Sequence, residues 1–367
     1  MEKLLVVSCV SDDKRSPISM YLMNNKLDDV VSGVNQCATA LGAEVLYLLP
    51  ENTEVSGLDA RVAHSITSPT LSNAYAVQQV LLGNLPRPMI QDDFVAVYED
   101  KEIAVITPAE AYLKVNGDGN RFVAVNCCDK TEIIEVKLGT TIGEIADLSA
   151  AKAVLVGGLK GEFMLPSQAA ETKLEATDLH ASITVISEGT CIVDLCAKLM
   201  AEIQTASCGK CVLCREGSLQ YKQIISEMTT GKAKAGDIAL VKEVGELIQI
   251  GAYCPFGQNM PKVIISAMEL FADEFDEHVK KKSCRCGVCY KAATLYYIDP
   301  DECTGCGDCI DECPEDAIEG KDGFIHMIDQ DLCEQCGKCV SACDEGCIKT
   351  ADKLPKLPKK RTKVGKW

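Results

Sequence analysis

The stretch SCGKCVLCREG, residues 207–217, places three cysteines at intervals of three residues and follows them with an arginine, a glutamate and a glycine. Such a run offers three thiolates, whereas a 4Fe-4S cluster requires four ligands. Cys254, in GAYCPFG, ends a later predicted helix, so an antiparallel return over two helices would bring it back to the first three. The sequence therefore predicts a cluster rather than a zinc knot or buried free thiols, with the ligands Cys208, Cys211, Cys214 and Cys254.

Two further cysteine runs have the CxxCxxCxxxC spacing of bacterial ferredoxins. They are CTGCGDCIDECPEDAI, residues 303–318, and CEQCGKCVSACDEGCI, residues 333–348, thirty residues apart. In two-cluster folds of this kind, the fourth cysteine of each run ligates the other cluster. We therefore predict two more 4Fe-4S clusters, one on Cys303, Cys306, Cys309 and Cys343, and one on Cys333, Cys336, Cys339 and Cys313.

Two of the differences between the runs bear on metal ligation. Asp344 replaces Pro314, a change that leaves all four thiolates in place. An additional cysteine, Cys347, stands where the first run has Ala317. Because alanine is small and apolar, this position favours a packed thiol over a further metal ligand.

The segment DEHVKKKSCRCGVCYKAA, residues 276–293, joins the two cysteine-rich regions. Cysteine and histidine are the ligands that tetrahedral zinc prefers, and a helix end followed by a tight turn could gather them. The sequence offers a candidate zinc site on His278, Cys284 and Cys289, with Cys191 or Cys286 as the fourth ligand. A linker with reduced thiols is an equal alternative, and Cys191 by itself favours a buried core thiol.

Composition supports metal ligation. The chain has 367 residues, 22 cysteines and a net charge of −17, and sixteen of the cysteines lie between positions 208 and 347. The sequence shows no secretory signal and no apolar stretch long enough to span a membrane, so we expect a cytoplasmic protein with reduced thiols and metal sites rather than disulfides. The negative charge argues against nucleic acid or an anionic lipid surface as the main partner.

Hydrophobic periodicity divides the chain into regions. Residues 3–9, 27–42 and 43–49 predict a strand, a helix ended by Gly42 and a second strand, and the region that follows 115 is rich in strands. Beyond residue 188 the pattern is helical, with a last long helix running to about residue 282. The predicted domains are 1–115 (α/β), 116–187 (β-rich), 188–282 (four-helix cluster-binding bundle), 283–298 (cysteine-bearing linker), 299–352 (ferredoxin-like) and 353–367 (basic tail).

The motifs GTCIVD, SCGKCVLCREG and CPFGQNMPKVIISAMELFADEF resemble the cluster domain of the NADH- and FMN-binding flavoprotein subunit of respiratory complex I and of the beta subunit of electron-bifurcating iron-only hydrogenases. VAVNCCDKTEIIEVKLGTTIGEI resembles the β-grasp (SLBB-like) module of that family, and the ferredoxin domain resembles the hydrogenase version. The resemblance implies an α/β and α+β multidomain fold, in which residues 1–115 are a shortened flavin domain.

The N-terminal region departs from the family. The resemblance implies a glycine-rich FMN loop before the strand KLLVVSC and an acidic stretch after it, but the sequence begins at that strand and continues as VSDDKRSPISM. The glutamate-rich flavin motif also has no counterpart. We therefore expect no residues that bind FMN or NAD, and no bound FMN. The cofactors expected besides the bundle cluster are the two ferredoxin clusters and the candidate zinc ion.

The sequence thus predicts an electron-transfer subunit of a hydrogenase-like or bifurcating oxidoreductase without catalytic residues of its own. Three 4Fe-4S clusters would relay electrons between a partner's redox centre and ferredoxin or another subunit, the expected partners being a catalytic subunit and a flavin- or 2Fe-2S-carrying subunit. The alternatives are an NAD(P)H-oxidising FMN flavoenzyme acting as a diaphorase, and a scaffold whose clusters do not turn over. The tail KLPKLPKKRTKVGKW has seven bases and no acid, which predicts a mobile tail or a clamp for an acidic partner.

Overall fold

The computed structural model of the chain forms two compact units, Met1–Cys289 and Tyr290–Trp367. It describes residues 2–11, 13–89, 94–117, 119–128, 130–176, 181–290, 295–330, 332–333, 336–351, 354–358 and 360–367. The boundary between the units falls inside the predicted linker, so that Cys284 and Cys289 belong to the first unit. Within the described residues, no helix combines the length and the apolar character that crossing a membrane requires.

The first sheet of the N-terminal unit has the strand order β3-β2-β1-β5-β4. β1 pairs in parallel with β2 and β5, β2 with β3, and β4 is antiparallel to β5. The predicted strand, helix and strand are confirmed, and Gly42 ends the helix in a left-handed conformation with φ of 62°. The strands are β1 (Lys3–Ser8), β2 (Ala43–Pro50), β3 (Val62–Ser65), β4 (Val97–Tyr98) and β5 (Lys101–Ile106).

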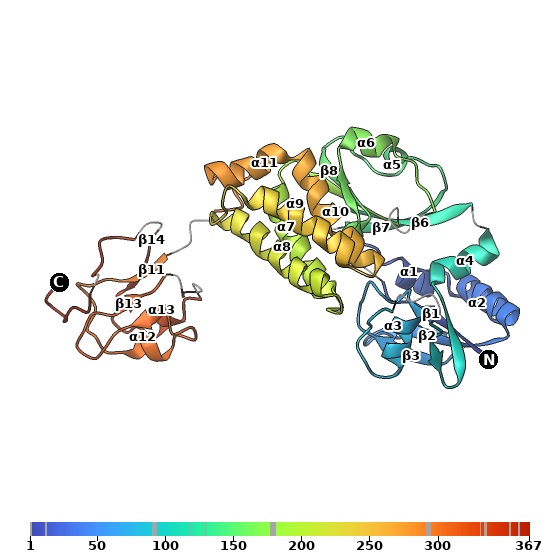
Figure 1. The fold of residues 1–367 in the computed structure, drawn as a ribbon, viewed down its shortest axis with the longest axis horizontal. Coiled ribbons are helices and arrows are strands. Elements are labelled where there is room, and N and C mark those ends of the chain that lie inside the picture. Colours follow the sequence, from blue (N-terminus) through green and yellow to red (C-terminus); the bar gives the residue numbers. More distant parts are fainter. Residues whose placement is uncertain are drawn as a thin grey trace. The chain divides into compact units, whose positions relative to one another are not determined.

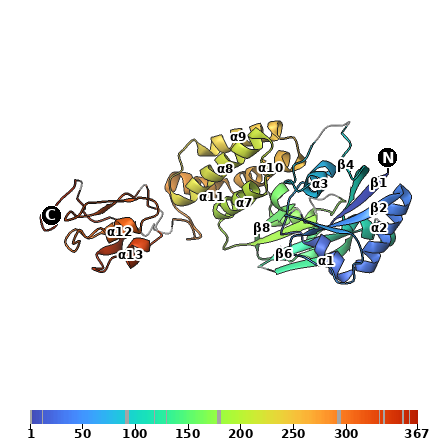
Figure 2. The same ribbon diagram turned by 90° about the horizontal axis from the view of Figure 1, so that it is seen from below.

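Helices cover both faces of this sheet (Figure 2). The side chains of β1 alternate because successive residues of a strand point to opposite faces. Leu5 and Val7 pack in one buried cluster with α1, α2 and α4, whereas Leu4 and Val6 pack in another with α3. The helices are α1 (Ile18–Asn25), α2 (Leu27–Leu41), α3 (Ala74–Leu81) and α4 (Pro108–Asn116).

A second five-stranded sheet, with the order β7-β6-β10-β8-β9, follows α4. β6 and β7 form an antiparallel hairpin, β10 is parallel to β6, and β8 is antiparallel to β10 and β9. The helices α5 (Ile142–Ile145) and α6 (Pro166–Glu171) pack on its buried apolar face (Figure 1). The strands are β6 (Asn120–Cys127), β7 (Lys130–Lys137), β8 (Ala151–Val156), β9 (Glu162–Met164) and β10 (Ser182–Ser187).

Four helices then pack side by side, as Figures 1 and 2 show. They are α7 (Ile192–Ala206), α8 (Val212–Thr230), α9 (Asp237–Gly251) and α10 (Pro255–Leu270). The prediction of one long helix running to residue 282 is wrong. The helix breaks at Phe271, which has φ of −120° and ψ of 37°, and α11 (Ala272–Asp276) and a π-helical turn (Glu277–Lys281) follow. The change of direction buries Phe275 and His278 and aims the next segment at α7.

The loop after β1 joins the two sheets and the bundle. Asp13 accepts hydrogen bonds from the backbone N–H of Leu159, at 2.8 Å, and from Arg15, whose guanidinium also pairs with Glu202 of α7 at 2.8 Å. Gly158, in the 3₁₀ turn Gly158–Lys160, has φ of 56°, and a Cβ there would lie 2.2 Å from the Asp13 carboxylate. Asp13 and Arg15, in the loop after β1, therefore hold the bundle beside both sheets.

The second unit consists of two similar halves. The first half contains β11 (Leu295–Ile298), α12 (Asp308–Asp311) and β12 (Ile318–Glu319), and the second contains β13 (Met327–Ile328), α13 (Lys338–Ser341) and β14 (Ile348–Ala351). The antiparallel pairs are β11 with β14 and β12 with β13. Each strand of one half therefore pairs with a strand of the other half, in keeping with the repeated sequence.

The described part of the basic tail is held against this unit, so the prediction of a mobile tail is wrong there. Ile325 donates a backbone hydrogen bond to Thr362 at 2.9 Å, and Val364 donates one to Gly323 at 3.2 Å. The Lys363 ammonium lies 6.0 Å from the ring centroid of Phe324, close enough for a cation–π contact. Lys353 and Lys359 lie outside the described residues.

Candidate metal centres

The four cysteines predicted to hold the bundle cluster come from two helix starts and the loop before them. Cys211 is the N-cap residue of α8, and Cys254 is the N-cap residue of α10. Cys214 lies in the first turn of α8, and Cys208 lies in the preceding loop. Backbone N–H groups at helix starts are unpaired and carry positive partial charge, so they favour thiolate ligands.

The surroundings of these thiols reflect that grouping. Burial raises the pKa of Cys254, backbone N–H groups led by that of Gly257 lower it, and the nearby Cys208 and Cys211 raise it. Burial also raises the pKa of Cys214, while a hydrogen bond from the Ser207 hydroxyl, 3.6 Å from its sulfur, lowers it. Sequence reasoning missed Ser207, although it directly precedes the cysteine run. The directions of these pKa shifts are consistent with four thiols that lie near one another, as the predicted ligand set requires.

Two groups of four cysteines occur in the second unit, and each draws its fourth member from the other run. Burial raises the pKa of Cys309 to about 12, and its charged neighbours are Cys303, Cys306 and Cys343. Burial likewise raises the pKa of Cys339, whose neighbours are Cys333, Cys313 and Cys336. A small cavity is lined by this second group, Cys313, Cys333, Cys336 and Cys339, together with the Tyr296 ring. These neighbours are the members of the crossed ligand sets expected from the spacing, which stay a prediction.

Two side chains beside the first of these groups are further potential donors. Cys347 is buried, and its sulfur lies 3.3 Å from that of Cys343. His326 is only 2% exposed, and its Nδ1 lies 3.6 Å from the sulfur of Cys309. The packed thiol predicted at position 347 is consistent with this burial. His326 carried no signal in the sequence because no cysteine run contains it.

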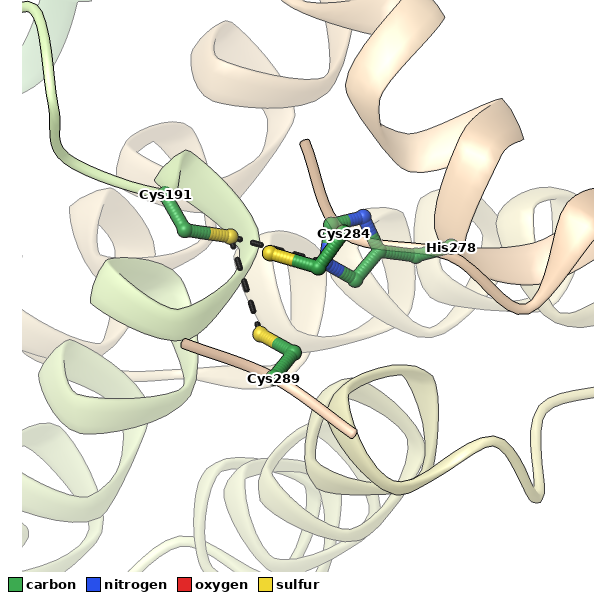
Figure 3. Close-up of side chains that lie close together, drawn as sticks. All are labelled: Cys191, His278, Cys284 and Cys289. Atoms are coloured by element: carbon green, nitrogen blue, oxygen red, sulfur yellow. Dashed lines mark hydrogen bonds between the residues drawn. The ribbon is translucent and has the colours of Figure 1, made fainter. Parts of the chain in front are cut away.

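The candidate zinc residues converge in the first unit. The ligand atoms of Cys191, His278, Cys284 and Cys289 all lie within 4.8 Å of one another (Figure 3). The Cys191 sulfur lies 3.5 Å from Nε2 of His278 and 3.7 Å from the sulfur of Cys289. With Zn–S of about 2.3 Å and Zn–N of about 2.0–2.1 Å, a tetrahedral site separates such atom pairs by about 3.6 and 3.8 Å. Of the two alternatives for the fourth position, Cys191 lies in this group and Cys286 does not.

The groups around this site orient its ligands. Nδ1 of His278 lies 2.8 Å from the carbonyl oxygen of Glu274, so a proton on Nδ1 turns the unprotonated Nε2 toward the Cys191 sulfur. Burial raises the pKa of the Cys284 thiol, but the backbone N–H groups of Cys289, Val288 and Cys286 lower it to about 6. The buried Glu274 carboxylate also pairs with Lys152 of β8 at 2.5 Å and accepts from the N–H of Ile192. Sequence reasoning missed Glu274, because the acidic run around it is typical of a solvated helix face.

Sequence comparisons identify two known domains. Residues 194–278 match the NADH-ubiquinone oxidoreductase-F iron-sulfur binding region, and residues 295–344 match the 4Fe-4S dicluster domain. The domain assignments agree with the bundle group and the ferredoxin groups, which lie inside these ranges. 4Fe-4S cluster-binding domains are thus present in both units of the chain.

Curated relatives are subunits of larger oxidoreductases. The NADP-reducing hydrogenase subunit HndC of Solidesulfovibrio fructosivorans is 34% identical over 51% of this chain and 41% of the relative. The NAD-reducing hydrogenase HoxS subunit alpha of Cupriavidus necator is 27% identical over 56% of this chain and 35% of the relative. The F subunit of the NADH-quinone oxidoreductase of Streptomyces coelicolor is 24% identical over 41% of this chain and 36% of the relative. The matched region therefore spans less than half the length of each of these relatives.

A solved structure shares the fold. A chain of an NAD⁺-reducing [NiFe]-hydrogenase in the H₂-reduced state superposes with a TM-score of 0.69 at 15% identity, covering 76% of this chain and 57% of that one. The likeness establishes a mixed α/β multidomain fold. Together, the comparisons confirm the resemblance read from the sequence: the chain is a homologue of the F subunit of NADH–quinone oxidoreductases and of hydrogenase subunits such as HndC, with a 4Fe-4S dicluster domain.

Proposed function

We propose that the chain is an iron–sulfur electron-transfer subunit of a multisubunit oxidoreductase of the hydrogenase or complex I type. Its three 4Fe-4S clusters relay electrons between a partner's redox centre and ferredoxin or another subunit. The observation that carries the proposal is that cysteines gather in fours, one set around the starts of α8 and α10 and two sets in the second unit. Bound iron–sulfur clusters supply one-electron chemistry, and the protein sets their potentials by ligation, hydrogen bonding and burial.

The direct test is an anaerobic preparation of the full chain analysed for iron, sulfide, zinc and flavin. Three clusters of four irons give about twelve irons per chain. Dithionite should reduce the clusters, and an oxidised electron carrier should re-oxidise them. Iron near eight, or stoichiometric FMN with NADH-driven dye reduction, would contradict the proposal, the latter in favour of a flavoenzyme. Clusters that cannot be re-oxidised would instead identify a scaffold.

We further propose that residues 1–115 are an α/β domain related to the flavin domain of that family, and that residues 116–187 form a β-grasp (SLBB-like) module. The first assignment is supported by the parallel order of β2, β1 and β5, and the second by a sheet in which a parallel β6–β10 pair is flanked by antiparallel strands. On this proposal both regions hold the bundle in place through Asp13 and Arg15.

We also propose a structural zinc ion on Cys191, His278, Cys284 and Cys289. Three features support it: ligand spacing that fits a tetrahedron, burial of three of the four side chains, and the hydrogen bond that orients His278. The four residues leave no position for a substrate, so the ion would act in folding rather than in catalysis. It would fix the segment after the bundle to the start of α7.

A further inference from the structure

The two halves of the second unit are related by a shift of thirty residues. The N–H of Asp299 donates to the carbonyl of Cys347 at 2.8 Å, and the N–H of Asp329 donates to the carbonyl of Ala317, also at 2.8 Å. Strand pairing repeats in the same way, with Ile298 opposite Ile348 and Ile328 opposite Ile318. Positions thirty residues apart therefore occupy equivalent places, one beside each ferredoxin cysteine group.

Two of the residue differences between the halves place a hydrogen-bonding side chain beside one cysteine group and not at the equivalent place in the other half. His326 stands where the other half has Tyr296, and Cys347 stands where the other half has Ala317. Both exceptional residues lie beside the group Cys303, Cys306, Cys309 and Cys343, called here the first ferredoxin cluster. The symmetry-related Tyr296 lines the cavity of the other group, called the second ferredoxin cluster.

His326 is built into its place. Its ring packs against Gly320, where a Cβ would lie 1.6 Å from the ring carbon Cδ2, so only glycine leaves room. Nε2 is buried and has no hydrogen-bond partner among the described residues, while Nδ1 lies 3.6 Å from the Cys309 sulfur. In the neutral ring one nitrogen carries the proton. If Nδ1 carries the proton, it donates to the Cys309 sulfur. The unprotonated Nε2 then has no proton to donate, and it lies against Gly320.

Cys347 supplies a second donor to the same cluster. It is 4% exposed, and its sulfur is 3.3 Å from that of Cys343 and close to that of Cys303. A thiol S–H is a weak hydrogen-bond donor, and the Cys347 sulfur lies close enough to donate to the sulfur of the proposed ligand Cys343. Ala317, the equivalent residue at the second ferredoxin cluster, has no polar atom in its side chain.

We propose that His326 and Cys347 are positioning residues that hydrogen-bond to the ligands Cys309 and Cys343 and raise the reduction potential of the first ferredoxin cluster above that of the second. Reduction adds negative charge to a cluster and its thiolates, and donors to sulfur stabilise the reduced state more than the oxidised one. With the clusters bound, His326 and Cys347 would therefore make the first ferredoxin cluster the favoured resting place of an electron and the site of onward transfer. The inference rests on the proposed function, because it assumes that both clusters are present.

The test is to exchange the two environments in the full chain and measure both potentials by an EPR-monitored anaerobic titration. The double variant H326Y/C347A gives the first cluster the residues of the second and should lower its potential until the two clusters titrate together. The reciprocal variant Y296H/A317C should raise the potential of the second cluster. Unchanged potentials in both variants would overturn the proposal.

Two further measurements distinguish a change of potential from a folding defect and from a failure of the proposed function. H326N retains an N–H donor near the position of Nδ1 and should keep the first potential near its original value, whereas H326L should lower it. Iron content is measured on every variant. Wild-type protein that lacks the two ferredoxin clusters would refute the proposed function, whereas intact clusters of equal potential would refute only the inference drawn from His326 and Cys347.

Discussion

The surroundings of each cysteine decide what that cysteine can do. Cys196 is fully buried on α7, and burial strongly raises the pKa of its thiol, so it packs as a small hydrophobic residue. Cys191, one turn earlier, caps the start of the same helix and faces His278 and Cys289. The same residue type is therefore inert or ligating according to its neighbours.

Removing the cysteine at the helix cap should remove the zinc ion. C191S is expected to lower zinc from about one ion per chain to near zero while iron stays unchanged, because one of four tetrahedral ligands is lost. Zinc and iron are measured together by elemental analysis of the purified protein. The matched control is C286S, which lies outside the group and should retain its zinc. Loss of zinc from C286S but not from C191S would assign the fourth position to Cys286.

The distant ligand of the bundle cluster gives a second prediction. C254A should reduce iron from about twelve to about eight per chain, because one cluster of four irons loses a ligand while the ferredoxin clusters keep theirs. The EPR signals of the ferredoxin clusters should persist. The control is C9A, a buried thiol in the apolar cluster that includes Leu5 and Val7, which should leave iron unchanged. A full complement of iron in C254A would exclude this ligand.

At the scale of elements, glycines set how closely the helices of the bundle approach. Gly217, the last residue of SCGKCVLCREG, lies where α8 meets α9, and a Cβ there would lie 2.5 Å from a side-chain carbon of Ile248. Gly245 of α9 faces Tyr221 of α8 in the same way. The glycine of the opening stretch therefore serves the packing that returns Cys254 to the other three cysteines.

Adding one methyl group at this crossing should destabilise the bundle. G217A is expected to lower the free energy of unfolding by about 1–3 kcal/mol, because overpacking of a close-packed contact forces side chains or backbone to shift. Chemical denaturation followed by circular dichroism under anaerobic conditions gives the value. G236A is the matched control, since a Cβ at Gly236, the N-cap of α9, meets no atom within 4 Å. Equal stability of the two variants would show that α8 and α9 separate easily.

At the scale of the whole molecule, the chain divides into two units, and we expect each unit to bind its own cofactors. A chain cut after Cys289 should yield an N-terminal piece with zinc and about four irons and a C-terminal piece with about eight irons. Each cysteine group lies entirely within one unit, so neither piece lacks a ligand. Iron that appears only when both pieces are expressed together would contradict the assignment of ligands.

The basic tail should affect the rate of exchange with an acidic electron carrier. It is anchored at Gly323, whose N–H donates to the carbonyl of Gly305, in the loop that carries the exposed Cys306. K360E/R361E should slow reduction of an acidic 2×[4Fe-4S] ferredoxin by about ten-fold at low salt, because charge steers association, and the difference should fade at high salt. Stopped-flow kinetics give the rates. K242E/K262E, two exposed lysines of the bundle, is the control and should leave the rate unchanged.

The sequence by itself determined the elements and the ligand types. Cysteine spacing predicted three groups, and periodicity predicted β1, α2 and β2, the strand-rich region after residue 115 and the helical region after residue 188, because these signals are local. Only the tertiary structure placed Cys191 rather than Cys286 beside His278, ended the long helix at Phe271, and held the tail against Phe324. These outcomes depend on which distant side chains meet. His326 is the clearest case. Its contact with Cys309 arises because strands of the two halves pair with each other, whereas the sequence shows the halves only as a repeat.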